Sequence, residues 1–187
     1  MSLTALDPKT ALIVVDLQQG IVGFPFIHPI ADVIAQTGSL IDAFRRRHLP
    51  VVLVNVAGGA PGRTEQPGRR QTRPEGWADL IPELGQQPSD ILVTKRTWGA
   101  FASTDLETRL RAMGVTQVVI AGVATGTGVE STARQAYEQG FNVTLATDAM
   151  TDVRPEAHEY SLKHVFPRLG ETGSTQDVLD LLANRSA

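Results

Sequence analysis

The chain has 187 residues, 42% of them hydrophobic, and a formal net charge of −3 at pH 7. This length and composition predict one domain, residues 1–187, with a sizeable core. A mildly acidic chain lacks the basic surface that nucleic acid requires, so we expect no nucleic-acid partner. The chain contains no cysteine, which excludes disulfides, thiolate metal sites and thiol nucleophiles.

The N-terminal ten residues have no basic segment followed by an apolar run, and the longest apolar runs elsewhere are strand-sized. We therefore expect a cytoplasmic protein with no membrane partner.

The first predicted strand, residues 11–15, is an unbroken apolar and β-branched run that ends at Asp16. Residues 20–29 mix glycine and proline with two phenylalanines, one of them Phe24, and predict an irregular loop with apolar walls. Apolar residues at helical spacing predict a helix over 30–48, and residues 51–56 predict a second strand.

Residues 57–76 form a loop that is too long and too rich in glycine, proline and arginine for an idle connection. Its arginines, Arg63, Arg69, Arg70 and Arg73, exceed its two glutamates and leave a surplus of two positive charges. This surplus suits a lid over an anionic substrate. A solvated loop or a subunit contact is the alternative interpretation.

The second half of the chain alternates strands and helices. A strand over 91–94 ends at Lys95, and Ser103 or Thr104 can cap a helix that runs to Met113. The remaining predicted elements are strands at 118–121, 142–146 and 169–172 and helices at 128–139, 155–166 and 175–183. This alternation predicts a three-layer α/β/α, Rossmann-like fold, with a parallel sheet covered by helices on both faces.

Polar residues are expected to meet at the carboxyl ends of these strands. Ligands of parallel sheets bind there, so Asp16, Lys95 and the turn 124–128 should share one crevice. In an apolar pocket, burial raises the pKa of a carboxyl group and lowers that of an ammonium group, so such a pair can hold or move a proton. A purely structural ion pair between two strand ends is the alternative.

Three segments of the chain resemble the isochorismatase-like hydrolase superfamily: ALIVVDLQQG, VTKRTWGAF and VVIAGVATGTGVESTARQAYEQGFNVTLATDAMTD. The resemblance covers most of the chain. It implies a parallel sheet of about six strands, a homo-oligomer (dimer or larger), and an Asp-Lys-Cys triad in which Asp16 and Lys95 match the first two members. It also implies a cis peptide between Val123 and Ala124, followed by N–H groups that form an oxyanion hole.

Gly128 stands where the cysteine hydrolases of this superfamily have their nucleophile. Amide hydrolysis by their route needs a thiolate, which this chain lacks. The nearby hydroxyls of Thr125, Thr127 and Ser131 do not occupy the nucleophile's position. The Asp/His metal cluster of nicotinamidases is also missing, and the four histidines are scattered, so we expect no metal and no cofactor.

An Asp-Lys-Gly set resembles the true isochorismatases, which hydrolyse the vinyl ether of isochorismate. That reaction protonates an enol-ether carbon, which a carboxylic acid can do as general acid. Asp16 would be that acid if its apolar surroundings raise its pKa against the opposing effect of Lys95, or if Lys95 faces a substrate carboxylate instead.

The residues expected to contact a small anionic substrate are Gln18, Phe24, Trp98, Phe101, Ala124 and Thr125. Core packing is the alternative role for Trp98 and Phe101, and plain loop exposure is the alternative for Gln18. Two other functions remain open: a catalytically lapsed scaffold that binds a small anion or a protein, and hydrolysis of another substrate by water activated by Asp16 as base.

Overall fold

The computed structural model describes residues 3–65 and 73–184. Six strands form one sheet in the order β3-β2-β1-β4-β5-β6, and every neighbouring pair is parallel. The strands are β1 (Thr10–Val15), β2 (Val51–Val56), β3 (Ile91–Lys95), β4 (Gln117–Val123), β5 (Asn142–Thr151) and β6 (Glu171–Gly173). The predicted six-stranded parallel sheet is confirmed.

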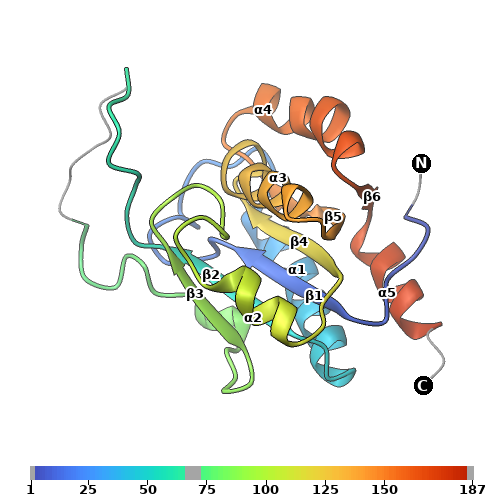
Figure 1. Ribbon diagram of the computed structural model, residues 1–187. Helices are drawn as coiled ribbons and strands as arrows, with labels where there is room; N and C mark the ends of the chain where they lie inside the picture. Colours follow the sequence, from blue (N-terminus) through green and yellow to red (C-terminus); the bar gives the residue numbers. More distant parts are fainter. Residues whose placement is uncertain (1–2, 66–72, 185–187) are drawn as a thin grey trace.

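Helices cover both faces of the sheet, as Figure 1 shows. The helices are α1 (Ile30–Arg46), α2 (Leu106–Ala112), α3 (Glu130–Glu138), α4 (Pro155–Tyr160) and α5 (Thr175–Ala183). Apolar side chains of α1 and α5 pack in one buried cluster, and those of α2 and α3 pack in another on the opposite face. The predicted three-layer arrangement is therefore confirmed. Within the described ranges, no helix is long and apolar enough to cross a membrane.

The two central strands, β1 and β4, are buried along their whole length, because helices shield both faces of a parallel sheet. They approach closely where Val15 pairs with Gly122. Gly122 has φ +111°, and a Cβ there would lie 2.1 Å from the carbonyl oxygen of Val15, so only glycine fits.

Several element boundaries differ from the sequence-based expectations. Strand β5 continues to Thr151, because it re-pairs with the end of β4 after a register shift. The helix expected over 155–166 is α4 followed by a π-helical turn, η3 (Ser161–Val165), and a short 3-10 turn, η4 (Phe166–Arg168). The helix expected from Ser103 or Thr104 begins at Leu106, whose N–H donates to Oγ1 of Thr104 at 3.3 Å.

The helix expected over 128–139 is preceded by a π-helical turn, η2 (Thr125–Val129), before α3 begins at Glu130. Because α3 follows η2 without interruption, Gly128 lies in the opening turn of one continuous helical segment. The carboxyl ends of β1, β3 and β4 lie on the same side of the sheet, beside η2.

Candidate active site

Asp16 and Lys95 form a buried ion pair at the carboxyl ends of β1 and β3. Nζ of Lys95 donates to Oδ2 of Asp16 at 2.7 Å and to the carbonyl oxygen of Thr97 at 3.3 Å. Asp16 is 6% exposed and Lys95 1%. The backbone of Asp16 is left-handed, with φ +55°, a conformation that aspartate tolerates better than most residues. The structure thus brings together two of the predicted catalytic residues.

The carboxyl group of Asp16 is suited to hold a proton. Burial raises its pKa to about 6, although the charge and hydrogen bond of Lys95 both act to lower it. Desolvation therefore outweighs the attraction of the ammonium group. Its second oxygen, Oδ1, is buried and has no hydrogen-bond partner in the described part of the chain. This free oxygen is the position from which a proton could be donated.

Gly128 lies against the same carboxyl group. A Cβ built on Gly128 would lie 3.0 Å from Oδ2 of Asp16, from the carbonyl oxygen of Val123 and from Cγ1 of Val15. This is tighter than ordinary van der Waals contact, so a side chain at position 128 would require its neighbours to move. The third predicted residue therefore lies beside the Asp16 carboxyl group, in a space that suits glycine.

The turn that carries Gly128 begins with a cis peptide bond between Val123 and Ala124, as the resemblance implied. The N–H groups of Thr127 and Val129 donate to the carbonyl oxygen of Ala124 at 3.0 and 3.2 Å. Both hydrogen bonds lie within the turn and tie η2 to the residue that precedes it. The turn thus holds Ala124 and Gly128 as a compact unit beside Asp16.

Helix α3 supports the loop that follows Lys95, which sequence reasoning missed. Oε1 of Gln135 accepts the N–H groups of Phe101 and Ala102 at 3.0 and 3.1 Å. Oγ1 of Thr132 accepts the N–H of Ala100 at 3.1 Å and donates to the carbonyl oxygen of Gly128 at 2.7 Å. Thr132 therefore joins this loop to η2. One signal for this contact is present in the sequence, because polar residues at helical spacing lie on the alanine-rich face of α3.

Gln18 is fully buried. Its Nε2 donates to the carbonyl oxygens of Val56 and Trp77 at 3.2 and 3.0 Å, and its Oε1 accepts the N–H of Val56 at 2.8 Å. The side chain therefore connects the end of β1 to the end of β2 and to residue 77. Its predicted contact with substrate remains a prediction.

The three aromatic residues expected at the pocket lie in different environments. Phe101 is buried in the core beside Phe141, with 5.8 Å between the ring centroids. Trp98 and Phe24 are 68% and 51% exposed. Phe101 thus has the position of a core residue, whereas Trp98 and Phe24 present apolar surface on the loops that follow β3 and β1.

Thr125, another residue predicted to contact substrate, is buried. Its hydroxyl group pairs with a histidine. Its Oγ1 lies 2.8 Å from Nδ1 of His158 on α4. His158 itself stacks edge to face on His28. No spacing pattern in the sequence relates these two histidines, so the pair could not be predicted from it.

Two arginine side chains lie beside the end of β3: Arg73, from the loop after β2, and Arg96, which directly follows Lys95. The N–H of Ala57 donates to the carbonyl oxygen of Lys95 at 2.9 Å. Beside it, Nη2 of Arg73 reaches the carbonyl oxygen of Gly58 at 3.5 Å, and a Cβ on Gly58 would lie 3.3 Å from Nη1 of Arg96. Two guanidinium groups therefore flank the carboxyl end of β3.

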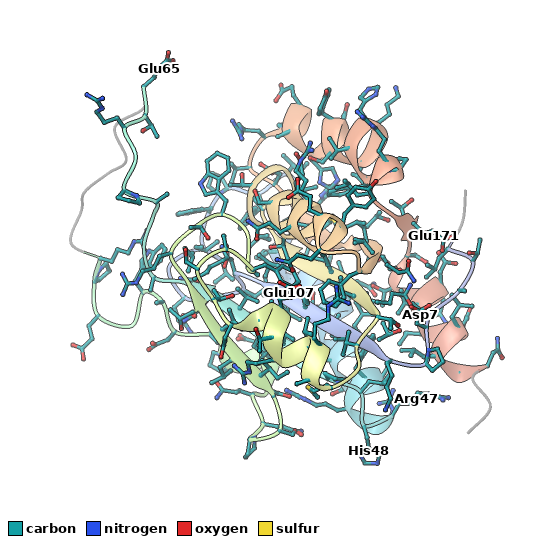
Figure 2. All side chains as sticks on the ribbon, in the orientation of Figure 1. Asp7, Arg47, His48, Glu65, Glu107 and Glu171 are labelled. Atoms are coloured by element: carbon teal, nitrogen blue, oxygen red, sulfur yellow. The ribbon has the colours of Figure 1, made fainter. Side chains whose placement is uncertain are left out.

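Other residues of the loop after β2 lie away from the sheet or outside the described residues. Glu65, at the end of the described range, lies far from the sheet in Figure 2. Arg69 and Arg70, which contributed to the predicted surplus of positive charge, lie outside the described residues.

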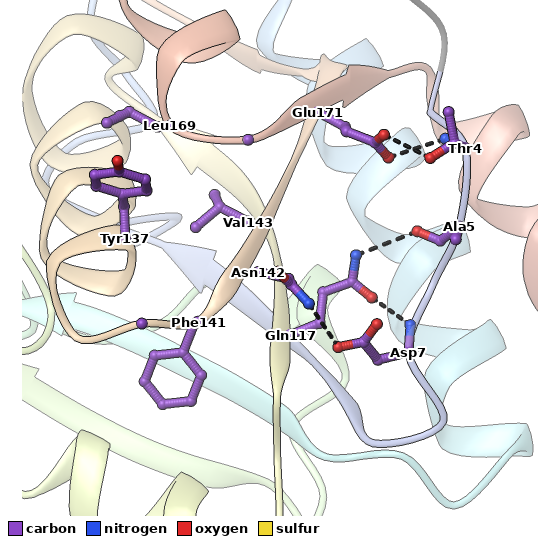
Figure 3. Close-up of a pocket in the computed structure, with 12 residues that line it drawn as sticks. Thr4, Ala5, Asp7, Gln117, Tyr137, Phe141, Asn142, Val143, Leu169 and Glu171 are labelled. Atoms are coloured by element: carbon purple, nitrogen blue, oxygen red, sulfur yellow. Dashed lines mark hydrogen bonds between the residues drawn. The ribbon is translucent and has the colours of Figure 1, made fainter.

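A pocket of about 470 Å³ lies at the opposite, amino ends of β4, β5 and β6 (Figure 3). Its polar groups bond to one another: Glu171 accepts from Thr4, and Gln117 and Asn142 bond to Asp7. The pocket is therefore remote from the Asp16 site. Among the described residues, no group of three or more His, Asp or Glu side chains could hold a metal ion.

Comparison with known proteins gives consistent matches. The isochorismatase domain model matches residues 10–177. The uncharacterized isochorismatase family protein YwoC of Bacillus subtilis is 41% identical over 179 residues, which cover 92% of this chain and 93% of that protein. The ureidoacrylate amidohydrolase RutB of Stutzerimonas stutzeri is 32% identical and covers 79% of this chain and 72% of its own.

A solved structure agrees with these matches. An isochorismatase family protein from Burkholderia thailandensis is 40% identical and superposes with a TM-score of 0.93. The superposition covers 98% of this chain and 100% of that chain. The similarity therefore extends over the whole fold, including the strands that carry the site.

Proposed function

Because the chain belongs to the isochorismatase family of hydrolases, we propose that it hydrolyses the vinyl ether of a small anionic substrate related to isochorismate. The observation that carries this proposal is the buried carboxyl group of Asp16, whose Oδ1 has no partner among the described residues and whose pKa is raised to about 6. A protonated carboxyl group at this position is a general acid.

In the proposed reaction, Oδ1 of Asp16 gives its proton to the terminal carbon of the vinyl ether. The adjacent carbon becomes an oxocarbenium ion, and water adds to it and returns a proton to Asp16. The resulting hemiketal transfers its hydroxyl proton to the ether oxygen and breaks its C–O bond. The products are pyruvate and a dihydroxy-cyclohexadiene carboxylate, and no covalent enzyme intermediate forms.

The position of Gly128 supports a mechanism without a nucleophile. A side chain there would press on the Asp16 carboxyl group at 3.0 Å, whereas glycine leaves that group in place. The backbone N–H groups of Thr125 and Gly128, at the start of a helical segment, would bind a substrate oxygen.

The positive charges near Lys95 support an anionic substrate. Lys95 is occupied by Asp16, so carboxylate groups of the substrate would be met by Arg73 and Arg96, which flank Gly58 beside the end of β3. Arginine binds carboxylates in bidentate geometry, and two arginines suit a substrate with two carboxylate groups.

The test is to incubate the purified protein with isochorismate and measure pyruvate release. Asp16→Asn should abolish release, while Asp42→Asn, an exposed aspartate of α1, should leave it unchanged. Absence of release from the native protein, or equal release from Asp16→Asn, would overturn the proposal.

The short ion pair supports a second candidate function. A carboxylate held by Lys95 at 2.7 Å can instead act as a base that activates water on a different substrate.

A third candidate function, the catalytically lapsed scaffold, predicts binding of pyruvate or a related anion without turnover. Calorimetric titration with pyruvate, run beside the release assay, separates binding from catalysis.

A further inference from the structure

Four polar side chains outside the Asp16–Lys95 pair form a group, here called the histidine cluster: His28, Thr125, Thr151 and His158. Nδ1 of His158 lies 2.8 Å from Oγ1 of Thr125, and Nδ1 of His28 lies 3.0 Å from Oγ1 of Thr151. The two imidazole rings meet edge to face, with 4.9 Å between centroids. The loop after β1, the turn η2, the end of β5 and helix α4 therefore meet at this cluster.

Thr125 belongs to the turn of the candidate active site. It follows Ala124 directly and precedes Gly128 by three residues. Its hydroxyl is fully buried, and His158 is the side chain that bonds it in the described part of the chain. Because a buried hydroxyl proton needs an acceptor, we assign Nδ1 of His158 as the acceptor and Thr125 as the donor.

A second contact holds the same turn from the same side. The N–H of Gly126 donates to Oδ2 of Asp152 at 2.8 Å, and Oδ1 of Asp152 accepts the N–H of Arg154 at 3.0 Å. Adjacent residues of η2 are therefore anchored to the end of β5 and to α4, while Gly128 faces Asp16.

We infer that His158 is a positioning residue: its neutral ring holds Thr125, and through Thr125 the η2 turn, in place beside Asp16, and protonation of the ring releases the turn. A protonated Nδ1 carries hydrogen and cannot accept from Thr125. The inference relies on the proposed function only in taking η2 as the turn that binds substrate.

Burial and the neighbouring groups together favour the neutral form of the His158 ring. Burial and the neighbouring His28 lower the pKa of His158, against the smaller opposing effects of Asp152 and Glu159. His28 faces it from the loop after β1, Asp152 from the end of β5, and Glu159 from α4 itself. Protonation of His158 therefore requires a lower pH than that of an ordinary histidine.

The experiment is amide hydrogen exchange of residues 122–131, measured by mass spectrometry from pH 4.5 to 7.5 and corrected for the intrinsic exchange rate. In the native protein, protection should fall by about three- to tenfold as the pH falls, which corresponds to the loss of one hydrogen bond. NMR titration of the His158 ring should give the same midpoint.

The variant His158→Asn separates this effect from titration of Asp16, which lies beside the same turn. Asparagine places an acceptor near the Nδ1 position but does not titrate, so protection should stay high at low pH. The matched control is His48→Asn. His48 follows the C-terminal end of α1 and lies away from α4 (Figures 1 and 2), so this variant should behave like the native protein.

Thr125→Val provides a second test if His158→Asn does not fold. It removes the hydroxyl with little change of shape, and protection should be low at every pH. Persistence of the native pH dependence in either variant would overturn the inference, as would native protection that does not change with pH. No substrate is used, so a failure to release pyruvate from isochorismate leaves this result standing.

Discussion

Lys95 occupies one oxygen of Asp16, Oδ2, at 2.7 Å, while the other, Oδ1, is buried without a partner among the described residues. The two oxygens of one carboxyl group are therefore unequal. A proton on Oδ1 is compatible with the Lys95 hydrogen bond, whereas a proton on Oδ2 would compete with it. The geometry thus directs the acid proton toward the oxygen that is free.

The first prediction concerns the pH dependence of pyruvate release. The acid form of Asp16 predominates below its pKa of about 6, so kcat should fall by about tenfold per pH unit above that value. Steady-state rates from pH 5 to 9 provide the measurement. A rate that rises through pH 6 would instead identify Asp16 as a base.

The second prediction concerns Lys95→Met. Lys95 lowers the pKa of Asp16 by its charge and its hydrogen bond, so its removal should raise that pKa further. The alkaline limb of the rate profile, along which kcat falls, should move to higher pH by the same amount. Lys163→Met, at an exposed lysine, is the control and should leave the limb in place.

The third prediction concerns the lack of space at position 128. Gly128→Ala places a methyl group 3.0 Å from Oδ2 of Asp16 and from the carbonyl oxygen of Val123. It should lower the free energy of unfolding by about 1–3 kcal/mol and reduce kcat, because the Asp16 carboxyl group must move. Urea unfolding and the pyruvate assay measure the two effects.

Gly38→Ala is the matched control for this change. Gly38 lies within α1, and a Cβ there meets no atom within 4 Å. Alanine should therefore raise stability by about 0.5–1 kcal/mol, since glycine is unfavourable in a helix. A Gly128→Ala protein as stable and active as the native one would contradict the predicted crowding.

The fourth prediction concerns stability as a function of pH. The folded state raises the pKa of Asp16 from 3.8 to about 6, so the folded protein binds the proton more tightly than the unfolded chain. The stability from this group is full below pH 3.8 and is lost as the pH rises through about 6. Between pH 4.5 and 8 the loss should be about 2 kcal/mol.

A double variant, Asp16→Asn with Lys95→Met, removes both charges of the pair and should lack this loss. The comparison is the difference in urea-unfolding free energy between the two proteins at each pH. His158 acts in the opposite direction, because its lowered pKa costs stability as the pH falls, and it affects both proteins equally. A constant difference across this range would contradict the raised pKa of Asp16.

The sequence predicted the sheet and the meeting of Asp16 with Lys95 because both depend on local patterns. Apolar runs mark buried strands, and Asp16 and Lys95 each come at the end of such a run, so parallel topology places them at one edge. The hydrogen bond between Lys95 and Asp16 agrees with that expectation.

Other parts of the site depend on contacts between segments distant in the sequence. Thr125 and His158 are 33 residues apart, and Gln135 and Phe101 are 34 apart. Gln18 shows the same limit, because a glutamine after a strand is typical of an exposed loop, yet tertiary contacts bury this one. No periodic pattern encodes such pairings, which only the folded sheet and helices bring together.

The Asp16–Lys95 bond also has a consequence for folding. Its partners are 79 residues apart, and β2 lies between their strands in the sheet. Contacts of such sequence separation close a long loop and form only after much of the chain is ordered. An intermediate without docked β3 would lack the pair, so proton chemistry at this site should begin only once that edge strand has joined the sheet.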